Sequence, residues 1–520
     1  MTTWWQSGVI YQIYPRSFAD SNGDGVGDLG GIRRHLDHLA WLGIDAVWIS
    51  PFFPSPMADF GYDVSDYCDV DPLFGTLADF DTLLAAAHAR GIKVVIDWVP
   101  NHTSDQHAWF ASSRSSRDDP KRDWYIWRDP APDGGPPNNW VGAFTGGSAW
   151  TLDAATGQYY LHLFLPEQPD LNWRNPEVVE AMHGTLRFWL DRGVDGFRID
   201  VVHGLVKRAD LADVDDGLAQ LATADRFDVP AIHDLIRGFR EILDSYEGDR
   251  MMVGEVYILS TAIVATFYGN GDLLHLAFNF PPLYTQWGAA RWRARIDRVV
   301  AELDARDAWP TWVLSNHDNP RHHTRYGSEA RARAAAVLLL TLRGTPFLYQ
   351  GEELGLEDAV VPPALVVDPG GRDGCRAPLP WVAAPPHGWD GDTPWLPWSP
   401  DSDRRSVEAE RADEQSMLWL YRRILVARRG SAALRTGAWR PLPTPDGVLG
   451  YERAAAADHR VVLVNFTGDE QCDVSAGLSA CIVEVSSAGT GEGEPFSGRL
   501  GPDEAVILAT EGGGRTVPRE

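Results

Sequence analysis

Gly196-Phe197-Arg198-Ile199-Asp200 is the stretch of sequence that decides the fold and the kind of site. It is a short apolar run that ends in a carboxylate. The same pattern returns where Glu255 follows residues 251–254 and where Asp318 follows residues 312–316. In a barrel of parallel strands the carboxyl ends of the strands converge on one mouth. The sequence therefore predicts that the three acids share one pocket.

Strand-like apolar runs alternate with segments of helical period from the start of the chain, which is typical of repeated βα units and a parallel sheet. A (β/α)₈ barrel takes about 250 residues, so a chain of 520 residues has room for one barrel and accessory parts. We predict an α/β fold with a (β/α)₈ TIM barrel. Its expected strands are residues 9–14, 46–50, 93–99, 196–200, 251–256, 276–280, 312–316 and 346–350.

Helix signals lie between these runs. Thr76-Leu77-Ala78-Asp79 has the form of a capping box, and the apolar positions that follow it predict a helix ending before Gly91. A second apolar stripe runs from Val179 to Leu190 at helical spacing and ends at Gly193. A third, with Met417, Leu420, Ile424 and Val426, precedes the last part of the chain.

Two stretches interrupt the alternation, and both are rich in Pro, Gly and Trp. We assign residues 1–102 and 175–430 to the barrel and residues 103–174 to an inserted subdomain B that roofs the pocket. Residues 357–400 form an irregular excursion after the eighth strand. Short strand-like runs in residues 431–520 predict a C-terminal antiparallel β-sandwich domain, and residues 511–520 a frayed tail.

The formal net charge is −27. A surface of this sign repels phosphate backbones and anionic lipid, so we expect no nucleic acid partner and no membrane surface partner. The N-terminus lacks the pattern of a secretory signal, and no apolar run reaches the length of a membrane span. The four cysteines are scattered without metal-type spacing. Free thiols in a reducing compartment are favoured over a Cys472–Cys481 disulfide, so a cytoplasmic location is expected.

The paired carboxylates indicate glycoside chemistry. Cleaving a glycosidic bond builds positive charge on the sugar, which one carboxylate can trap covalently while a second, protonated, acid releases the leaving oxygen. We assign Asp200 as the nucleophile and Glu255 as the acid and later the base. Arg198, two positions before Asp200, is expected to lower the pKa of its carboxyl. Taken alone, the Arg-Ile-Asp segment favours a structural ion pair at a strand end, and the other blocks favour the catalytic role.

The order and separation of four blocks resemble the α-amylase superfamily of glycoside hydrolases. These are Asp97-Trp98-Val99-Pro100-Asn101-His102, followed by the segments that contain Asp200, Glu255 and Asp318. Residues 168–172, Gln-Pro-Asp-Leu-Asn, resemble a fifth block of the oligo-1,6-glucosidase and α-glucosidase branch. The resemblance extends from Gly8 to about Trp398.

The resemblance implies roles for further residues. Asp318 is the third acid of the site, His102 and His317 bind sugar hydroxyls, and Asp97 supports Arg198. Tyr62 and Asp59 form the pocket floor. Gly371-Arg372-Asp373-Gly374-Cys375-Arg376 resembles a block that sends an arginine to that aspartate, and we assign Arg376, with Arg372 as the alternative. Further lining residues are expected to be Phe144, Phe164 and Gln168.

Residues 20–28 read Asp-Ser-Asn-Gly-Asp-Gly-Val-Gly-Asp and place oxygen ligands at alternate positions, as a calcium loop does. The bidentate glutamate expected at the twelfth position is missing, because Gly31 stands there. We favour a structural Ca²⁺ over an ion-free polar turn. Its ligands are predicted to be Asp20, Asn22, Asp24, the Val26 carbonyl and Asp28.

We therefore predict a retaining, exo-acting α-glucosidase that removes terminal glucose from small oligosaccharides or glucosides, with no metal or organic cofactor in the chemistry. Val201, next to the nucleophile, looks like the α-1,6-tolerant form in this branch. A transglucosylase or sucrose isomerase using the same intermediate is the alternative. A non-catalytic transporter heavy chain would need a membrane span and usually lacks the acids. The oligomeric state and the linkage stay open.

Overall fold

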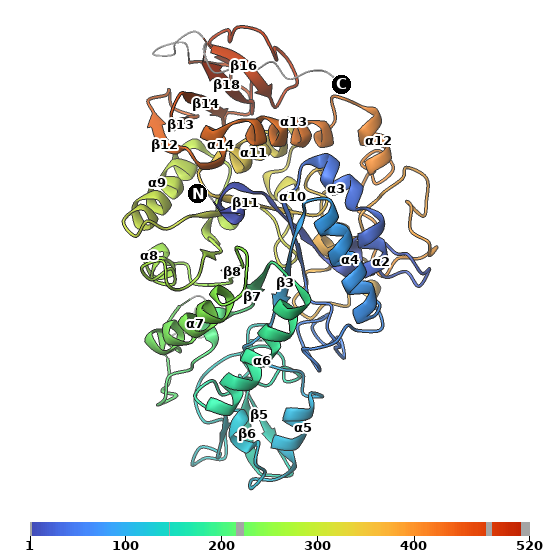
Figure 1. Ribbon diagram of the computed structural model, residues 1–520, viewed down its shortest axis with the longest axis vertical. Coiled ribbons are helices and arrows are strands. Elements are labelled where there is room, and N and C mark those ends of the chain that lie inside the picture. Colours follow the sequence, from blue (N-terminus) through green and yellow to red (C-terminus); the bar gives the residue numbers. More distant parts are fainter. Residues whose placement is uncertain (1–2, 145, 215–222, 475–480, 511–520) are drawn as a thin grey trace.

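The computed structural model describes residues 3–144, 146–214, 223–474 and 481–510. Its centre is a sheet of eight parallel strands in the order β10-β11-β1-β2-β3-β7-β8-β9 (Figure 1). The predicted barrel is confirmed, and each strand lies within or next to a predicted run. The strands are β1 (Ile10–Ile13), β2 (Ala46–Ile49), β3 (Lys93–Trp98), β7 (Gly196–Ile199), β8 (Met251–Gly254), β9 (Leu276–Ala277), β10 (Thr311–Val313) and β11 (Thr345–Tyr349).

The two end strands of this sheet, β9 and β10, are joined by a side chain. Thr311 Oγ1 donates to the carbonyl of Ala277 at 2.8 Å and accepts from the amide of Asn279 at 3.2 Å. The hydroxyl thus takes the place of a backbone ladder at the closure of the barrel. This explains why β9 stops at Ala277, whereas the sequence predicted a strand to residue 280.

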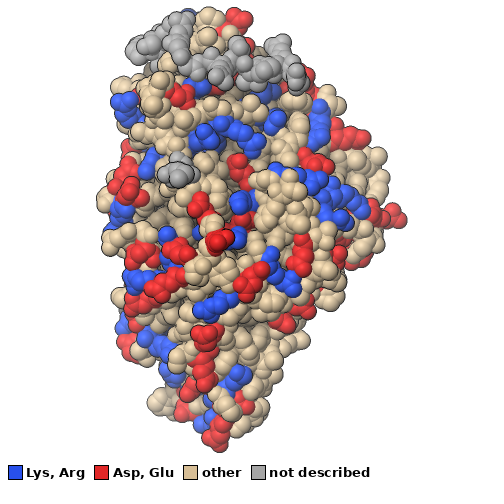
Figure 2. Space-filling model, viewed as in Figure 1, with Lys and Arg blue, Asp and Glu red and all other residues tan. Residues whose placement is uncertain are grey.

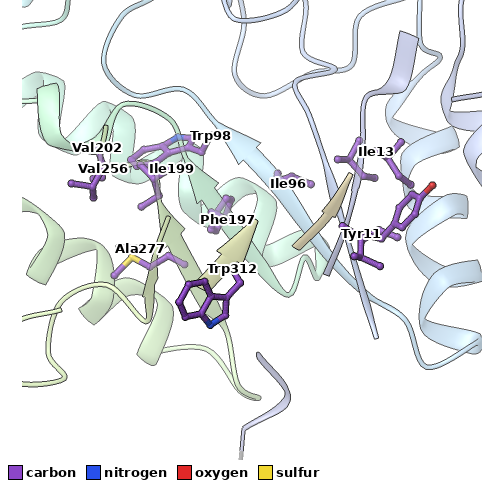
Figure 3. Packing of buried hydrophobic residues seen from close by; sticks show 14 of the residues in the cluster. Tyr11, Ile13, Ile96, Trp98, Phe197, Ile199, Val202, Val256, Ala277 and Trp312 are labelled. Carbon is purple, nitrogen blue, oxygen red and sulfur yellow. The ribbon is translucent and has the colours of Figure 1, made fainter. Parts of the chain in front are cut away.

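Alternate residues of each barrel strand belong to different core clusters. Ile10, Val95 and Val253 belong to a cluster inside the barrel. Their neighbours Tyr11 and Ile96 belong to the larger cluster between strands and helices. Figure 3 shows part of this larger cluster, with Tyr11 on β1, Ile96 on β3 and Phe197 on β7. Because side chains alternate along a strand, every second position of each strand faces the barrel axis.

Helices follow the strands and cover the outside of the barrel (Figure 1). The capping box is confirmed, since Thr76 and Asp79 exchange both hydrogen bonds at the start of α4. The second predicted helix, α6, ends at Gly193, whose φ of 102° suits glycine. The helices here are α2 (Leu29–Arg34), α3 (Leu36–Leu42), α4 (Leu77–Ala89), α6 (Pro176–Arg192), α7 (Val229–Asp244), α8 (Thr261–Thr266), α9 (Ala289–Asp304), α10 (His322–Tyr326) and α11 (Glu329–Thr341).

Two smaller β units lie at opposite ends of the long axis (Figure 1). Between β3 and α6 the chain forms α5 (Ala108–Ser115) and a three-stranded antiparallel sheet of β4 (Trp127–Arg128), β5 (Trp150–Asp153) and β6 (Gln158–Leu161). This sheet falls within the insertion predicted at residues 103–174. The domain boundaries themselves stay predictions.

The C-terminal antiparallel domain is confirmed as a five-stranded sheet in the order β12-β13-β14-β18-β16, beside the short pair β15 and β17. The third predicted helix, α13, leads into it. The elements are α12 (Val407–Ala412), α13 (Met417–Gly430), α14 (Ala432–Thr436), β12 (Ala438–Leu442), β13 (Val448–Ala455), β14 (Asp458–Asn465), β15 (Cys472–Asp473), β16 (Cys481–Ser486), β17 (Arg499–Leu500) and β18 (Ala505–Thr510). The tail predicted at residues 511–520 lies outside the described residues.

Both signs of charge are interspersed over the face shown in Figure 2. None of the four cysteines, all within described residues, forms a disulfide. Among the described helices, none is long and apolar enough to cross a membrane.

Candidate active site

The inward-facing positions of three neighbouring strands carry the predicted catalytic groups. Val95 faces the barrel axis, so Asp97 two residues later does as well. By the same alternation, Arg198 and Asp200 face the axis as Gly196 does, and Glu255 faces it as Val253 does. All of these side chains lie at the carboxyl ends of their strands, where a barrel places its active site.

Arg198 holds the acids together. Its Nη1 donates to Asp97 Oδ1 at 2.8 Å and to Asp200 Oδ1 at 2.6 Å. Its Nη2 lies 2.9 Å from Glu255 Oε2. The guanidinium is only 3% exposed, so water screens these contacts little. One buried cation thus fixes the positions of the predicted nucleophile and the predicted acid, as well as of the supporting Asp97.

Burial raises the pKa of Asp200 well above its ordinary value, and a hydrogen bond with Glu255 raises it further. Arg198 lowers this pKa and offsets part of the rise. The expected effect of Arg198 is thus present, but burial and the neighbouring carboxyls outweigh one guanidinium, so the net pKa of Asp200 lies above its ordinary value.

Val201, immediately after Asp200, has a φ of +44°. A β-branched residue rarely adopts this left-handed conformation, which costs about 1–3 kcal/mol. The turn brings the Val201 amide to Glu255, and Glu255 Oε2 accepts its hydrogen at 3.0 Å. Backbone strain next to Asp200 thus helps to hold Glu255 in place.

Ion pairs close one end of the pocket. Arg372 Nη2 lies 2.5 Å from Asp59 Oδ1, and Arg372 Nη1 lies 3.0 Å from Asp318 Oδ1. The assignment of Arg376 as the partner of Asp59 is therefore wrong, and the alternative, Arg372, is confirmed. Arg376 is fully buried and pairs with Asp318 at 3.1 Å and with Asp368 at 3.2 Å. The backbone turns between the two arginines, so only Arg372 reaches the cavity.

The charge of Asp318 is fixed by its neighbours. Burial raises the pKa of Asp318, but His317, Arg372 and Arg376 together bring this pKa below its ordinary value. His317 itself is neutral at neutral pH, because burial lowers its pKa to about 3. Its ring stacks on Tyr62 with centroids 5.4 Å apart, and the Tyr62 hydroxyl lies 2.6 Å from His317 Nε2. His317 lies behind Tyr62, outside the cavity wall; hydroxyl binding by His317 stays a prediction.

His102 and Gln168 are placed next to Asp59. Gln168 Nε2 donates to Asp59 Oδ2 at 3.0 Å and lies 3.1 Å from His102 Nε2. Gln168 is fully buried and supports the wall from behind. Burial lowers the pKa of His102 to about 4, so its ring is neutral at neutral pH. A neutral imidazole can exchange hydrogen bonds with sugar hydroxyls.

The cavity has a volume of about 300 Å³. Most of the predicted residues line it, namely Asp59, Tyr62, His102, Phe144, Phe164, Asp200, Glu255 and Asp318, together with Arg372. Sequence reasoning gave no site role to several others, namely His203, Arg226, Phe227, Tyr257, Tyr284 and Asn319. His203 and Tyr257 follow the catalytic acids by two or three positions, so their place after a barrel strand was a signal. Asn319 directly follows Asp318, whereas Arg226, Phe227 and Tyr284 belong to no motif.

The predicted calcium loop is ordered by its own backbone. Asp20 is buried, and its two oxygens accept hydrogen bonds from the amides of Asn22, Gly23, Gly25 and Gly391. Asp28 caps α2 by accepting from Gly31 at 2.7 Å. The described residues contain no group of three or more His, Cys, Asp or Glu side chains arranged to hold a metal. Calcium at this loop stays a prediction.

Residues 12–437 match the family model "Alpha amylase, catalytic domain". The chain belongs to this family, and it is an enzyme of the glycoside hydrolase class. It is 42% identical over 501 residues to a probable alpha-glucosidase of Rhizobium meliloti, with 90% of each chain covered. It is 37% identical over 514 residues to an oligo-1,6-glucosidase of Parageobacillus thermoglucosidasius, covering 89% of this chain and 90% of the relative.

Solved structures agree with this assignment. The chain resembles an alpha-glucosyl transfer enzyme, XgtA, with a TM-score of 0.90 and 42% identity, covering 98% of this chain and 100% of that one. It resembles the trehalulose synthase MutB from Pseudomonas mesoacidophila MX-45 with a TM-score of 0.92 and 35% identity, and the coverage is the same. The branch predicted from the sequence, oligo-1,6-glucosidase and α-glucosidase, is thereby confirmed.

Proposed function

We propose that the protein is a retaining, exo-acting α-glucosidase that acts on small saccharides. The observation that carries this proposal is the placement of Asp200 and Glu255 on one guanidinium, where Asp200 Oδ1 lies 2.6 Å from Arg198 Nη1 and Glu255 Oε2 lies 2.9 Å from Nη2. Retaining glycosidases place their two carboxyl groups about 5 Å apart, and inverting ones place them farther apart to admit water. Two carboxylates held by neighbouring nitrogens of one guanidinium favour the first geometry. Asp200 would attack the anomeric carbon and form a glucosyl ester.

Glu255 would give a proton to the leaving oxygen and then take one from the incoming water. Substrate binding excludes water from the pocket. The covalent bond to Asp200 then removes the negative charge of this carboxylate, next to Glu255. Asp318, kept ionised by its cationic neighbours, would bind hydroxyls of the same glucose. The pair of Arg372 and Asp59 would stop the chain at one sugar unit, which supports exo action. We keep the cytoplasm as the predicted location.

Transglucosylation or sucrose isomerisation is the second candidate, because XgtA is named as a transfer enzyme and MutB as a trehalulose synthase. All of these reactions would use the same ester, and only the acceptor differs. The test is product analysis with maltose, isomaltose and sucrose in parallel, at low and high concentration. Glucose released first as the α-anomer supports the proposal. Isomers or longer sugars at every concentration support transfer, and β-glucose as the first product contradicts retention.

A further inference from the structure

Arg226 brings a positive charge to the cavity that no side chain of the described residues pairs with. Its side chain lines the same cavity as Asp200 and Glu255, yet the residue is only 1% exposed. Nη1 donates to the carbonyl of Val141 at 3.2 Å. Nε is buried without a hydrogen-bond partner. In the described part of the chain no carboxylate forms an ion pair with this guanidinium, in contrast to Arg198 and Arg372.

The surroundings of Arg226 are apolar. Its guanidinium lies 5.6 Å from the ring centres of both Trp140 and Phe227. Burial lowers the pKa of Arg226 to about 10, and Asp170 partly opposes this. Asp170 is already paired with Lys207 at 2.6 Å. Arg226 is therefore charged at neutral pH, and a buried charge without a counter-charge is costly.

The backbone holds Arg226 in a fixed place. Lys207 and Phe227 form an antiparallel bridge. The amide of Arg208 donates to the carbonyl of Arg226 at 2.9 Å, and that of Asp228 donates to Val206 at 2.8 Å. The base of this loop is thus a short two-stranded ladder. This backbone pairing fixes the position from which the Arg226 side chain extends.

Arg226 lies on the side of the pocket where Glu255 acts. Phe227 packs edge-on against His203, with ring centres 5.4 Å apart. His203 Nδ1 in turn lies 3.2 Å from the carbonyl of Glu255. Arg226 takes no part in the charge network of Arg372, Asp59 and Asp318, which closes the glucose end. The acid faces the leaving group, so Arg226 is next to the space for the aglycone.

We propose that Arg226 binds an anionic group, a carboxylate or a phosphate, on the aglycone of the substrate. This inference rests on the proposed glucosidase function and names the substrate class of the same site. A planar guanidinium can donate two parallel hydrogen bonds to either anion. The acids that line the pocket repel an anionic aglycone, so a cation beside Glu255 is what would admit one. Such a group would compensate the charge of Arg226.

The experiment compares matched aryl α-glucosides. The 4-carboxyphenyl α-glucoside and its methyl ester differ in one charge on the same ring, and the 4-phosphonooxyphenyl α-glucoside carries the other anion. Hydrolysis of each is measured for the wild type, Arg226→Met, Arg226→Lys and the control Arg208→Met. Arg208 is an exposed arginine in the same loop, paired with Asp210, so the control removes an equal charge without changing the cavity.

We expect the ratio of kcat/KM for acid over ester to fall at least about tenfold in Arg226→Met, as a charge-assisted hydrogen bond requires. The fall should be smaller in Arg226→Lys and absent in Arg208→Met. The anion whose ratio falls more is the one that the site prefers. An unchanged ratio for both anions overturns the inference, even while ester hydrolysis supports the glucosidase proposal. An ester that is not hydrolysed by the wild type contradicts the proposed function instead.

If the Arg226 variants do not fold, the salt dependence of the acid over ester ratio of the wild type still tests the inference. An acid over ester ratio above one that falls as KCl is added supports the inference, because salt screens the attraction. A ratio below one for both anions, or one that rises with salt, overturns it.

Discussion

Arg372 and Asp59 meet at 2.5 Å across a wall of the cavity, although they are far apart in the sequence. Arg372 comes from the excursion after β11 and Asp59 from the loop after β2. The same guanidinium also lies 3.0 Å from Asp318 and 2.6 Å from Asp368. One side chain thus joins three carboxylates at the closed end of the pocket, so the proposed exo action would depend on it.

Arg372→Lys tests this relationship. Lysine keeps the charge, but its donors all lie on one nitrogen and cannot span the distance between the carboxylates as the planar guanidinium does, so some of the three carboxylates lose their partner. We expect kcat/KM for maltose or isomaltose to fall at least about tenfold, mainly through KM, because a charged hydrogen bond contributes about 1.5–3 kcal/mol. The control is Arg34→Lys, whose pair with Asp390 is exposed. Equal losses in the two variants would contradict the role of Arg372.

Asp200→Asn removes the nucleophile while keeping its shape. We expect kcat to fall by at least about 10⁴, because the covalent step is lost. The unfolding temperature should change little, since Arg198 still has Asp97 and Glu255 as partners. Steady-state kinetics and thermal unfolding measure the two effects separately. A variant that turns over at more than a few per cent of the wild-type rate would refute the ester mechanism.

Glu255→Gln removes the proton donor. A phenolate such as 4-nitrophenolate leaves without protonation, whereas a sugar alkoxide needs it. We therefore expect formation of the ester from isomaltose to lose at least about 10² more than its formation from 4-nitrophenyl α-glucoside. Pre-steady-state kinetics with both substrates measures this. Asp200→Asn is the matched control, because loss of the nucleophile should affect both substrates alike. Equal losses in Glu255→Gln would show that Glu255 is not the acid.

The sequence was sufficient for the barrel and for placing the predicted acids at one mouth, because both follow from alternation along strands. Once residues 196–200 are a strand whose Phe197 and Ile199 pack against the surrounding helices, Arg198 and Asp200 face the axis at its end. The capping box at Thr76 and the glycine stop at Gly193 are equally local signals.

The parts that could not be predicted depend on loops and on burial. Arg372 and Arg376 are four residues apart, and only the turn between them decides which one reaches Asp59. Arg226 belongs to no motif, and its place in the wall follows from a ladder between the two ends of one loop. The net rise in the pKa of Asp200 could not be predicted, because the depth of burial that outweighs Arg198 does not follow from the neighbouring residues in the sequence.

Calcium at residues 20–28 can be tested by stability alone. A bound ion stabilises only the folded state, so excess Ca²⁺ should raise the unfolding temperature and EDTA should lower it. We expect a shift of a few degrees that Mg²⁺ does not reproduce, because Mg²⁺ demands smaller, regular coordination. Asp24→Asn, at an exposed position of the loop, should reduce the shift. The same unfolding temperature in Ca²⁺ and in EDTA would show that the loop is an ion-free polar turn.

Glu410 predicts a pH dependence of stability far from the active site. Burial raises its pKa to about 8, although the Leu418 amide and Arg405 lower it. In the unfolded chain a glutamate has a pKa of about 4.3. Between these two values the folded protein holds a proton that unfolding releases. The contribution of Glu410 to the free energy of unfolding is therefore full below about pH 4 and falls as the pH rises toward 8.

Glu410→Gln removes this titration and can still accept from Leu418, whose amide lies 2.8 Å from Glu410 Oε2. We expect the unfolding temperature of the variant, relative to the wild type, to rise steadily from about pH 5 to about pH 8. The gain corresponds to about 1.4 kcal/mol for each pKa unit crossed, a few kcal/mol at most. Glu414→Gln, at an exposed position nearby, is the control and should give a flat difference. A difference for Glu410→Gln that is equally flat would place its pKa near the ordinary value, and the burial argument would be wrong.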